Sequence, residues 1–291
     1  MTTALYNTTA FRSAVSRATH QLYDRPLIFD DPLAVKILGD EAATRLQASA
    51  TVASGAMRRG MRAALVGRAR IAEDMLHEAV ERGVRQYVVL GAGLDTFAYR
   101  NPHRHRGLRV FEVDLPAMQE WKMKLLGAAD IPVPDNVQYV AVDFERDILR
   151  NKLIDAGVDT GLPVFFSWLG VTMYLTEAQV LDTLHTIASG FARGSGVAFD
   201  YIRADRALHP LGRMLRRLLA RRYSRIGEPW RGFFDPPVLI ARMQEFGYSS
   251  VVDLPSDAIH ARYFGERSDA LGFHRLGVRA TRLGGMICAR R

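Results

Sequence analysis

The sequence contains a single cysteine, Cys288, among its 291 residues. One thiol cannot form an internal disulfide, so cross-links are excluded as a source of stability. No group of cysteines and histidines has the spacing of metal ligands, and His103 and His105 in NPHRHR are interpreted as solvated loop residues. We therefore predict a fold without a metal centre.

Long hydrophobic runs are also absent. No run of about 18 or more apolar residues occurs, and the N-terminal stretch MTTALYNTTAFRSAVSRATH lacks the apolar core of a secretory signal. Hydrophobic residues still make up 48% of the chain, which is enough to fill a sizeable core. These features predict a soluble, cytoplasmic protein without a membrane partner.

Acidic residues are fewer than basic ones, 31 against 39, and the formal net charge is +8. The excess is local, because residues 213–225, RMLRRLLARRYSR, hold six arginines and no acid, and without them the net charge would be +2. Proteins that follow a nucleic-acid backbone usually spread basic residues along a face. Here the arginines share a helix with leucines. We interpret the segment as a mobile lid whose charge favours an acidic substrate.

Short apolar segments alternate with longer amphipathic ones along the chain. Apolar residues recur on one helix face between residues 65 and 82, and Thr176 is a cap for a helix that begins at Glu177. Parallel strands need such crossovers, so the alternation predicts an α/β fold with an open parallel sheet. The predicted strands are 86–90, 109–113, 137–142, 163–169, 196–202, 251–254 and 284–290.

Two segments fall outside this alternation. Residues 10–38 predict a helix, a proline-punctuated loop and a short helix that begins near Asp31 and Pro32. Residues 203–237 interrupt the pattern, which resumes with a helix at 238–246. We therefore predict a single domain over 1–291, with an N-terminal helical cap over about 1–60 and an inserted helical lid over about 203–237.

The stretch YVVLGAGLDTFAYR, residues 87–100, indicates a ligand. A buried strand leads into Gly91 and Gly93, and a helix start follows. Glycines lack Cβ atoms, so the backbone can turn sharply and a nucleotide-like ligand can lie against it. The dinucleotide fingerprint G-x-G-x-x-G needs a third small residue where this chain has Thr96, which weakens an NAD or FAD interpretation.

Acidic residues end the next two predicted strands. Asp114 lies 21 residues beyond Gly93, where a carboxylate can accept both hydroxyls of a ribose. Asp143 ends the third strand, where it can accept a hydrogen bond from an adenine amino group. Because α/β sheets bind ligands at the carboxyl ends of their strands, these features together favour an adenosine site. An adenosine site that lacks the pyrophosphate-binding fingerprint suggests S-adenosyl-L-methionine as the ligand.

These motifs resemble the leucine carboxyl methyltransferase family, and more closely its bacterial branch, which includes polyketide carboxyl O-methyltransferases. The resemblance rests on YVVLGAGLDTFAYR, VFEVDLP at 110–116, YVAVDFERD at 139–147 and FFSWLGVTMYLTEAQV at 165–180. It implies an S-adenosyl-L-methionine-dependent methyltransferase. The implied fold is the class I, Rossmann-like open sheet of about seven mostly parallel strands flanked by helices, with an antiparallel last strand.

The resemblance also implies roles for individual residues. Gly91 and Gly93 would form the cofactor loop, Asp114 would bind the ribose, and Asp143 and Phe144 would hold the adenine. The full set of expected cofactor-binding residues is Arg68, Gly91, Ala92, Gly93, Asp114, Leu115, Asp143, Phe144 and Ser167.

Two further positions are compared with the family pattern. An arginine upstream of the glycine strand binds the cofactor's carboxylate in that family, and Arg68 is the best match, with Arg70 close behind. Family members carry a glutamate beside the cofactor where this chain has Leu169. This difference argues against placing the chain in the subgroup of that family that methylates a phosphatase.

The acceptor is expected above the sheet, between the cap and the lid. A carboxylate with a pKa of about 4 is ionised at pH 7, so an ester-forming enzyme needs no general base, whereas a phenol or an amine can need one. The histidines are scattered singly, and we assign no catalytic residue. The candidate acceptor-binding residues are Arg12, Arg17, Tyr23, Tyr201, Arg203, Trp230 and Phe233.

Three functions follow from these observations. The first is methylation of the carboxylate of a small secondary metabolite, an acidic or aromatic molecule, with S-adenosyl-L-methionine as cofactor. The second is methylation of a phenol oxygen, a nitrogen or an aromatic carbon. The third and least favoured is nucleic-acid binding through residues 213–225. A homodimer is also considered.

Overall fold

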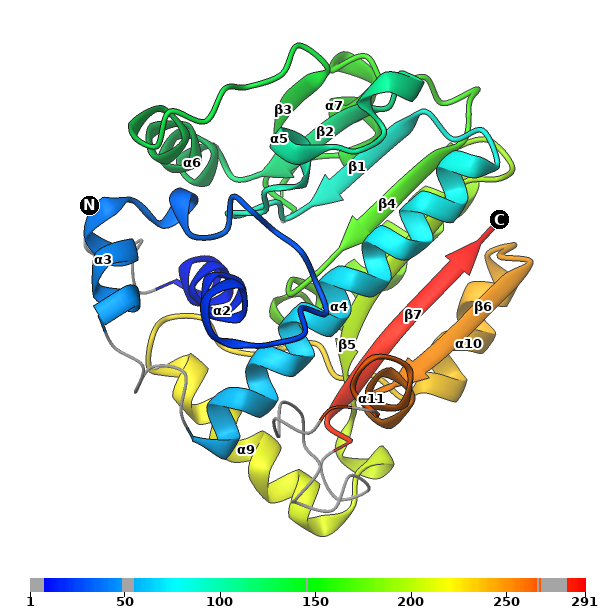
Figure 1. The fold of residues 1–291 in the computed structure, drawn as a ribbon. Helices are drawn as coiled ribbons and strands as arrows, with labels where there is room; N and C mark the ends of the chain where they lie inside the picture. The colour runs from blue at the N-terminus through cyan, green and yellow to red at the C-terminus, as the bar shows by residue number, and fades with distance from the viewer. Residues whose placement is uncertain (1–7, 49–54, 145, 266, 268–281) are drawn as a thin grey trace.

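The computed structural model describes residues 8–48, 55–144, 146–265, 267 and 282–291. The strands of this part of the chain form one seven-stranded sheet in the order β3-β2-β1-β4-β5-β7-β6 (Figure 1). Neighbouring strands are parallel, except that β7 runs antiparallel to both β5 and β6. The predicted α/β sheet with its antiparallel last strand is therefore confirmed. The strands are β1 (Gln86–Leu90), β2 (Arg109–Asp114), β3 (Val137–Ala141), β4 (Val164–Trp168), β5 (Gly196–Ile202), β6 (Ser250–Pro255) and β7 (Gly284–Arg290).

Helices cover both faces of the sheet, and Figure 1 shows α4 crossing one of them. Side chains of α7, α8 and α10 share a buried cluster with one side of the sheet, and side chains of α4, α5 and α11 pack on the other. The helices are α2 (Thr9–Tyr23), α3 (Asp40–Ala48), α4 (Ala56–Glu81), α5 (Phe97–Arg100), α6 (Pro116–Ala128), α7 (Leu149–Asp155), α8 (Glu177–Gly190), α9 (Pro210–Ser224), α10 (Pro236–Glu245) and α11 (Ser256–Phe264), with short 3-10 turns η1 (Lys36–Leu38), η3 (Arg104–Arg106), η4 (Thr172–Tyr174) and η5 (Asp205–Ala207).

The central strand β1 contributes to both cores. Successive side chains of a strand point to opposite faces, so Val88 and Leu90 enter one cluster while Tyr87 and Val89 enter the other. All five residues of β1 are buried. Both faces of the strand are covered, which explains the apolar run Tyr87–Leu90. The buried side chain of Gln86 exchanges hydrogen bonds with the backbone of Asp159, both at 2.8 Å.

The cap helix α2 lies beside α4 and belongs to a third hydrophobic cluster. Ala14 and Ala18 of α2 pack with Leu38, Trp121 and Leu126, so the cap is joined to α6 as well. Small alanine side chains allow a close approach of α2 to its neighbours. The cap helix is therefore packed against the rest of the domain.

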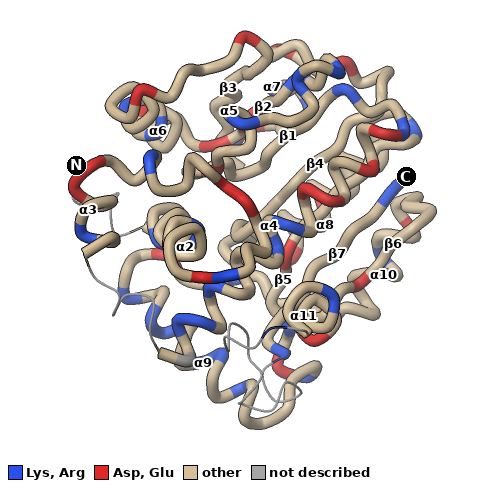
Figure 2. The backbone as a smooth tube through the Cα atoms, viewed as in Figure 1, with Lys and Arg blue, Asp and Glu red and all other residues tan. Residues whose placement is uncertain are grey.

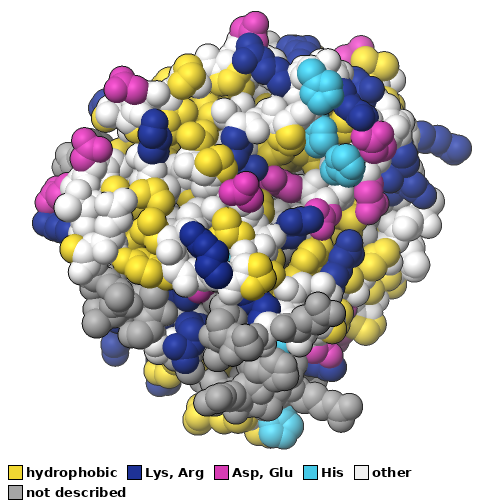
Figure 3. Space-filling model, viewed as in Figure 1, with side chains coloured by type: hydrophobic (Ala, Val, Ile, Leu, Met, Phe, Trp, Pro, Cys, Tyr) yellow, Lys and Arg dark blue, Asp and Glu magenta, His cyan; other side chains and the backbone are white. Residues whose placement is uncertain are grey.

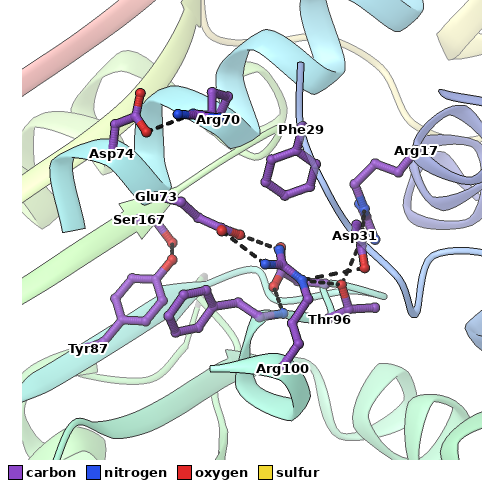
Figure 4. Close-up of polar contacts among 12 residues, drawn as sticks. Arg17, Phe29, Asp31, Arg70, Glu73, Asp74, Tyr87, Thr96, Arg100 and Ser167 are labelled. Carbon is purple, nitrogen blue, oxygen red and sulfur yellow. Dashed lines mark hydrogen bonds and ion pairs between the residues drawn. The ribbon is translucent and has the colours of Figure 1, made fainter. Parts of the chain in front are cut away.

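A buried ionic network ties this cap to the segment after the glycine loop (Figure 4). Asp31 is fully buried and accepts hydrogen bonds from Arg17 Nε at 3.2 Å and Thr96 Oγ1 at 2.7 Å. Arg100 Nε lies 3.4 Å from the same carboxylate, and the Arg100 guanidinium also pairs with Glu73 of α4. Two arginines thus balance the buried charge of Asp31. The network links the cap, α4 and α5.

Two predicted helices differ from the observed ones. The helix predicted from residue 65 begins at Ala56. The apolar pattern did not reveal its first turns, because their buried face includes the polar Arg62, which pairs with Asp24 at 2.7 and 2.8 Å. No helix begins at Asp31 and Pro32. The carboxylate of Asp31 is held by the buried network, and only the short turn Lys36–Leu38 is helical there.

The insertion carries α9, whose basic residues are visible in Figure 2. Arg216 points inward and donates to Asp205 Oδ1 at 2.7 Å, whereas Leu211, Met214 and Leu218 are exposed. Leu215 and Leu219 are half-buried, so α9 buries its apolar face less completely than a helix packed on a core. Within the described residues, no helix is both long and apolar enough to cross a membrane.

Candidate active site

A cavity of about 610 Å³ opens at the carboxyl ends of the central strands. It is bounded by the loops after β1, β2, β3 and β4, by α2 and α4, and by Gly227, Glu228, Pro229 and Arg231 of the insertion. This is the edge at which an α/β sheet reverses its strand order and binds ligands. All nine residues expected to bind the cofactor line it, namely Arg68, Gly91, Ala92, Gly93, Asp114, Leu115, Asp143, Phe144 and Ser167.

The glycine loop adopts a conformation that favours glycine. Gly91 has a φ of 69° and Gly93 a φ of 45°, both in the left-handed region. A Cβ atom on Gly91 would lie 2.3 Å from Val171 Cγ2, so a side chain would collide there as well. The amides of Gly91 and Ala92 donate to the carbonyl of Val113 at 2.8 and 3.0 Å, which fixes the loop against β2.

Asp114 projects into the same end of the cavity. Its Oδ2 accepts the amide of Gly93 at 2.6 Å and its Oδ1 the amide of Leu115 at 2.8 Å. A carboxylate has about four acceptor sites, so two remain for the hydroxyls of a ribose. Burial raises the pKa of Asp114, although the two amide hydrogen bonds act in the lowering direction.

Phe144 and Asp143 form the next part of the wall, at the end of β3. The Phe144 ring stacks on Trp168 with centroids 6.2 Å apart and an interplanar angle of 23°. The backbone of Asp143 is held by the carboxylate of Asp147, which accepts its amide at 2.9 Å. A flat apolar surface beside a carboxylate suits a purine with an exocyclic amino group.

Ser167 lies deeper in the cavity wall, on β4. Its hydroxyl is 2.7 Å from the Tyr87 hydroxyl, and both side chains are buried. One hydroxyl donates to the other, so both buried groups have a hydrogen-bond partner. Figure 4 shows this pair below α4, separate from the Asp31 network.

Arg68 reaches the cavity from α4. Its Nη1 donates to Asp200 Oδ2 at 2.8 Å, and Asp200 Oδ1 accepts the amide of Gly170 at 2.6 Å. Arg70 instead pairs with Asp74 at 2.7 Å, outside the cavity, so the geometry favours Arg68 over Arg70. Leu169 lines the cavity next to this group, and its apolar side chain adds no ligand for a charged cofactor group. The donor set otherwise fits an adenosine cofactor with a terminal carboxylate.

Among the seven candidate acceptor-binding residues, only Arg17 lines the cavity. Its guanidinium is already bound to Asp31 and to the carbonyl of Leu94, at 2.6 Å for the latter. Arg12, on the same helix, lies outside the lining, and Tyr23 donates to the carbonyl of Leu46 at 2.8 Å. Arg17 and Tyr23 are therefore engaged in hydrogen bonds that stabilise the cap.

The other four candidates also lie outside the cavity lining. Tyr201 donates to Asp253 Oδ1 at 2.7 Å, and Arg203 lies 3.8 Å from the same carboxylate. Trp230 stacks on Tyr223 at 4.9 Å between centroids, and Phe233 lies under the guanidinium of Arg216 at 4.2 Å. The geometry does not favour an acceptor-binding role for these residues, and the role stays a prediction.

Four residues that the sequence did not single out line the cavity where α2 meets the insertion: Thr9, Tyr174, Glu228 and Arg231. Tyr174 lies in the motif GVTMYL, and Glu228 is the first acid after the arginine-rich segment, so both had a signal in the sequence. Burial raises the pKa of Glu228 and of Tyr174. The backbone amide of Arg231 donates to the carbonyl of Met173 at 2.7 Å, which anchors the insertion over η4.

A second groove of about 450 Å³ lies between α4 and η3, on the face shown in Figure 3. His77, His103 and His105 line it together with acidic and basic residues, and the first two rings stack at 5.3 Å. No three His, Cys, Asp or Glu side chains of the described part of the chain form a group that could hold a metal ion. None of the residues expected to bind the cofactor lines this groove, so the first cavity is the candidate active site.

Comparisons with known proteins identify the family of this chain. The family model "Leucine carboxyl methyltransferase" matches residues 10–188. The Bacillus subtilis protein YktD, named as an S-adenosyl-L-methionine-dependent methyltransferase, is 31% identical over 285 residues, covering 90% of this chain and 93% of its own. A Saccharopolyspora erythraea protein with the same descriptive name is 34% identical over 202 residues, or 68% of each chain.

Solved structures support the fold. A DUF574 family protein from Streptomyces avermitilis has a TM-score of 0.55 at 16% identity, with 96% of this chain and 97% of that chain covered. A protein from Thermobifida fusca that is described as a methyltransferase has a TM-score of 0.55 at 18% identity, with 96% of this chain and 94% of that chain covered. At these identities the similarity concerns the fold alone.

Proposed function

This chain belongs to the leucine carboxyl methyltransferase family and is an S-adenosyl-L-methionine-dependent methyltransferase, and from that premise we propose that it methylates the carboxylate of a small secondary metabolite. One observation carries the proposal. At the end of the cavity where α2 meets the insertion, which we assign to the acceptor, the amide and hydroxyl of Thr9 already hold a carboxylate, that of Glu228, and no histidine occurs among the described residues that line the cavity. Such a wall suits an acceptor that is already an anion.

The residues of the chain have mainly positioning roles in this reaction. When bound, S-adenosyl-L-methionine supplies a methyl group on a sulfonium sulfur; an acceptor oxygen provides the electron pair of the new bond, and the pair of the broken bond stays on sulfur. The glycine loop and Asp114 would hold the nucleoside, and Arg68 would pair with the terminal carboxylate. An ionised acceptor releases no proton, so catalysis consists of alignment and exclusion of water.

A second candidate function is favoured by Glu228. Its carboxylate lines the acceptor end, and burial raises its pKa, so it is suited to accept a proton from a phenol or an amine. In that case the products would be methyl ethers or N-methyl compounds rather than esters. Methylation of an aromatic carbon belongs to the same alternative.

Product chemistry separates the two candidates. The purified protein is incubated with methyl-labelled cofactor and a panel of carboxylic acids, phenols and amines, and each labelled product is treated with mild alkali. Esters release the label as methanol, whereas ethers, N-methyl and C-methyl products retain it. Alkali-stable label as the main product would contradict carboxylate methylation.

The nature of the acceptor, the oligomeric state and the role of α9 are also proposals. We propose a small acidic or aromatic acceptor, a homodimer in solution and the arginine-rich α9 as a lid that attracts an acidic acceptor. Nucleic-acid binding by α9 is least favoured, because its exposed surface mixes arginines with Leu211, Met214 and Leu218. Salt-dependent binding of RNA that is lost on substitution of Arg221 and Arg222 by alanine would support it instead.

A further inference from the structure

The segment that follows the glycine loop is held by the N-terminal cap. Leu94 comes directly after Gly93, and its carbonyl accepts a hydrogen bond at 2.6 Å from Nη2 of Arg17, which lies 77 residues earlier in the chain. The side chain of Leu94 is buried in the hydrophobic cluster that contains Ala14 and Ala18 of α2. The cap therefore fixes both the backbone and the side chain of Leu94.

Thr96 makes a second connection to the cap. It is the N-cap residue of α5, a position where a threonine hydroxyl usually accepts a hydrogen bond from a helix amide, but its side chain makes no capping hydrogen bond. The hydroxyl instead donates to Asp31 Oδ2 at 2.7 Å and accepts from Arg100 Nε at 3.3 Å. Because Thr96 is fully buried, its hydroxyl is committed to the contact with the cap rather than to the helix that it begins.

Arg17 and Thr96 bind the same oxygen atom of the cap. Arg17 Nε donates to Asp31 Oδ2 at 3.2 Å, and the Thr96 hydroxyl donates to that atom as well. Figure 4 shows these side chains converging on the carboxylate, whose side chain has no exposed surface. One buried carboxylate of the cap thus fixes Thr96 directly and Leu94 through Arg17.

A network of buried charges is not the simplest means of attaching the cap. The hydrophobic cluster already joins α2 to α6, and the burial of charged groups has a desolvation cost that apolar packing avoids. Hydrogen bonds, however, depend on angle as well as distance, so they define the orientation of the groups that they join. The network is therefore suited to set the position of residues 94–96.

The segment held in this way forms part of the cavity wall. Leu94 and Asp95 line the cavity beside Gly93, whereas Thr96 and Asp31 lie outside the lining. Thr96 and Asp31 can therefore act on a bound cofactor only through the residues beside them.

The glycine loop makes contacts that depend on its position. The amide of Gly93 donates to Asp114 Oδ2 at 2.6 Å, and a Cβ atom on Gly93 would lie 3.2 Å from Ala10 Cβ of α2, so the cap also packs closely on the loop. A displaced loop would deprive the carboxylate expected to bind the ribose of this hydrogen bond.

We propose that Thr96, through Asp31 and Arg17 of the cap, positions the glycine loop for S-adenosyl-L-methionine. Thr96 is then a positioning residue and not a cofactor ligand. The inference goes beyond the proposed function, because it holds whether the acceptor is a carboxylate, a phenol or an amine. It also gives a role to the residue that stands where the dinucleotide fingerprint has its third small residue, since this threonine binds the cap.

The first measurement is calorimetric titration with S-adenosylhomocysteine. Thr96→Val removes the hydroxyl and keeps the shape, and we expect the Kd to rise about tenfold. Thr96→Ser keeps the hydroxyl, and its Kd should stay within about twofold of the native value. Thr183→Val is the matched control with no expected change, because Thr183 is also buried and its hydroxyl donates to the carbonyl of Gln179 within α8. Urea unfolding without ligand establishes that each variant is folded under the conditions of the titration.

The second measurement is amide hydrogen exchange without ligand. Peptides that cover residues 91–97 should exchange faster in Thr96→Val than in the native protein and in Thr183→Val, whereas peptides from α8 should exchange alike in Thr96→Val and the native protein. Arg17→Lys is a second variant with the same expected directions. It keeps a positive charge beside Asp31, but one ammonium group lacks the fork of donors with which the guanidinium binds both Asp31 and Leu94.

A role in stability alone predicts a lower free energy of unfolding with unchanged affinity for S-adenosylhomocysteine. The inference is overturned if the Kd of folded Thr96→Val and Arg17→Lys stays within about twofold of the native value. It is also overturned if the Kd rises without faster exchange of residues 91–97, or if Thr183→Val weakens binding equally. Native protein that does not bind S-adenosylhomocysteine contradicts the cofactor site itself, and with it this inference.

Discussion

Asp200 on β5 holds Arg68 on α4 and the amide of Gly170 at the same time, at 2.8 and 2.6 Å. Arg68, which lines the cavity, is thereby held in place, and the turn after β4 is fixed beside it. Gly170 has a φ of 74°, and a Cβ there would lie 2.7 Å from Arg68 Nη2, so the position also demands glycine. The carboxylate that pairs with Arg68 comes from β5 and is not part of the cavity lining, whereas Leu169, at the position of the family's glutamate, is.

The first prediction concerns this ion pair. Asp200→Asn keeps an acceptor for Gly170 but removes the charge that orients Arg68, so the Kd for S-adenosyl-L-methionine should rise about tenfold. Asp74→Asn is the matched control, because it breaks the Arg70–Asp74 pair of the same helix at 2.7 Å, outside the cavity. Calorimetric titration measures both. Equal affinities for the two variants would mean that Asp200 does not position Arg68 for the cofactor.

The second prediction concerns the glycine loop. Gly91→Ala combines a left-handed φ with a contact of 2.3 Å to Val171, and we expect it to lower the free energy of unfolding by about 3 kcal/mol. Gly83→Ala is the control for backbone strain alone, since its φ is 98° and no atom lies within 4 Å of the added Cβ; its expected cost is about 1–2 kcal/mol. Urea unfolding of the two variants gives the difference. A smaller loss for Gly91→Ala than for Gly83→Ala would contradict the close packing of the loop on Val171.

The third prediction is a pH dependence of cofactor binding. Burial raises the pKa of Asp114, so this carboxylate gains its proton at a higher pH than an ordinary aspartate. A raised pKa means that the folded protein holds the proton more tightly than the unfolded chain, so the stabilising effect of protonation is present at low pH and is lost as the pH rises through the folded pKa. Binding of ribose hydroxyls needs the ionised form.

Affinity for S-adenosylhomocysteine should therefore weaken as the pH is lowered from neutral, before ordinary aspartates titrate. The Asp114→Asn variant should bind weakly at all pH values and lack this dependence. Titrations at a series of pH values test the prediction. The same decline in the variant as in the native protein would assign the effect to another group.

The fourth prediction concerns the buried network of Figure 4. Asp31 is fully buried between Arg17 and Arg100, so Asp31→Asn leaves two buried guanidinium groups without its charge and should cost about 3–5 kcal/mol of stability. Asp135→Asn is the matched control, because its pair with Arg104 is exposed, and its expected effect is below about 0.5 kcal/mol. Denaturant unfolding compares the two. Similar losses in both variants would show that the network does not anchor the cap.

The cofactor end of the site was predictable because it depends on the backbone. The turn at Gly91 and Gly93, and acids at the ends of β2 and β3, have fixed positions once the strand order is known. Their residue types and their spacing along the chain are therefore enough to indicate a cavity at the strand ends. The sheet itself follows from the alternation of short apolar segments with amphipathic ones, and its predicted strands match the observed ones within one or two residues.

The acceptor end could not be predicted in the same way. It depends on which side chains of the insertion turn toward the cap, and no periodicity encodes that choice. Trp230 and Phe233 were candidates, but Glu228 and Arg231, in the same segment, line the cavity instead. The start of α4 was missed for a related reason, because buried Arg62 is compensated by Asp24, which lies 38 residues earlier in the chain.

The most direct test of the account is a calorimetric titration with S-adenosyl-L-methionine and S-adenosylhomocysteine, with NAD as control, on the native protein and on Asp114→Ala. The account predicts binding of the first two ligands at micromolar concentrations, loss of that binding in the variant, and no binding of NAD. Native protein that binds neither adenosyl ligand, or that binds NAD equally well, would contradict the assignment of the glycine loop and Asp114 as the cofactor site.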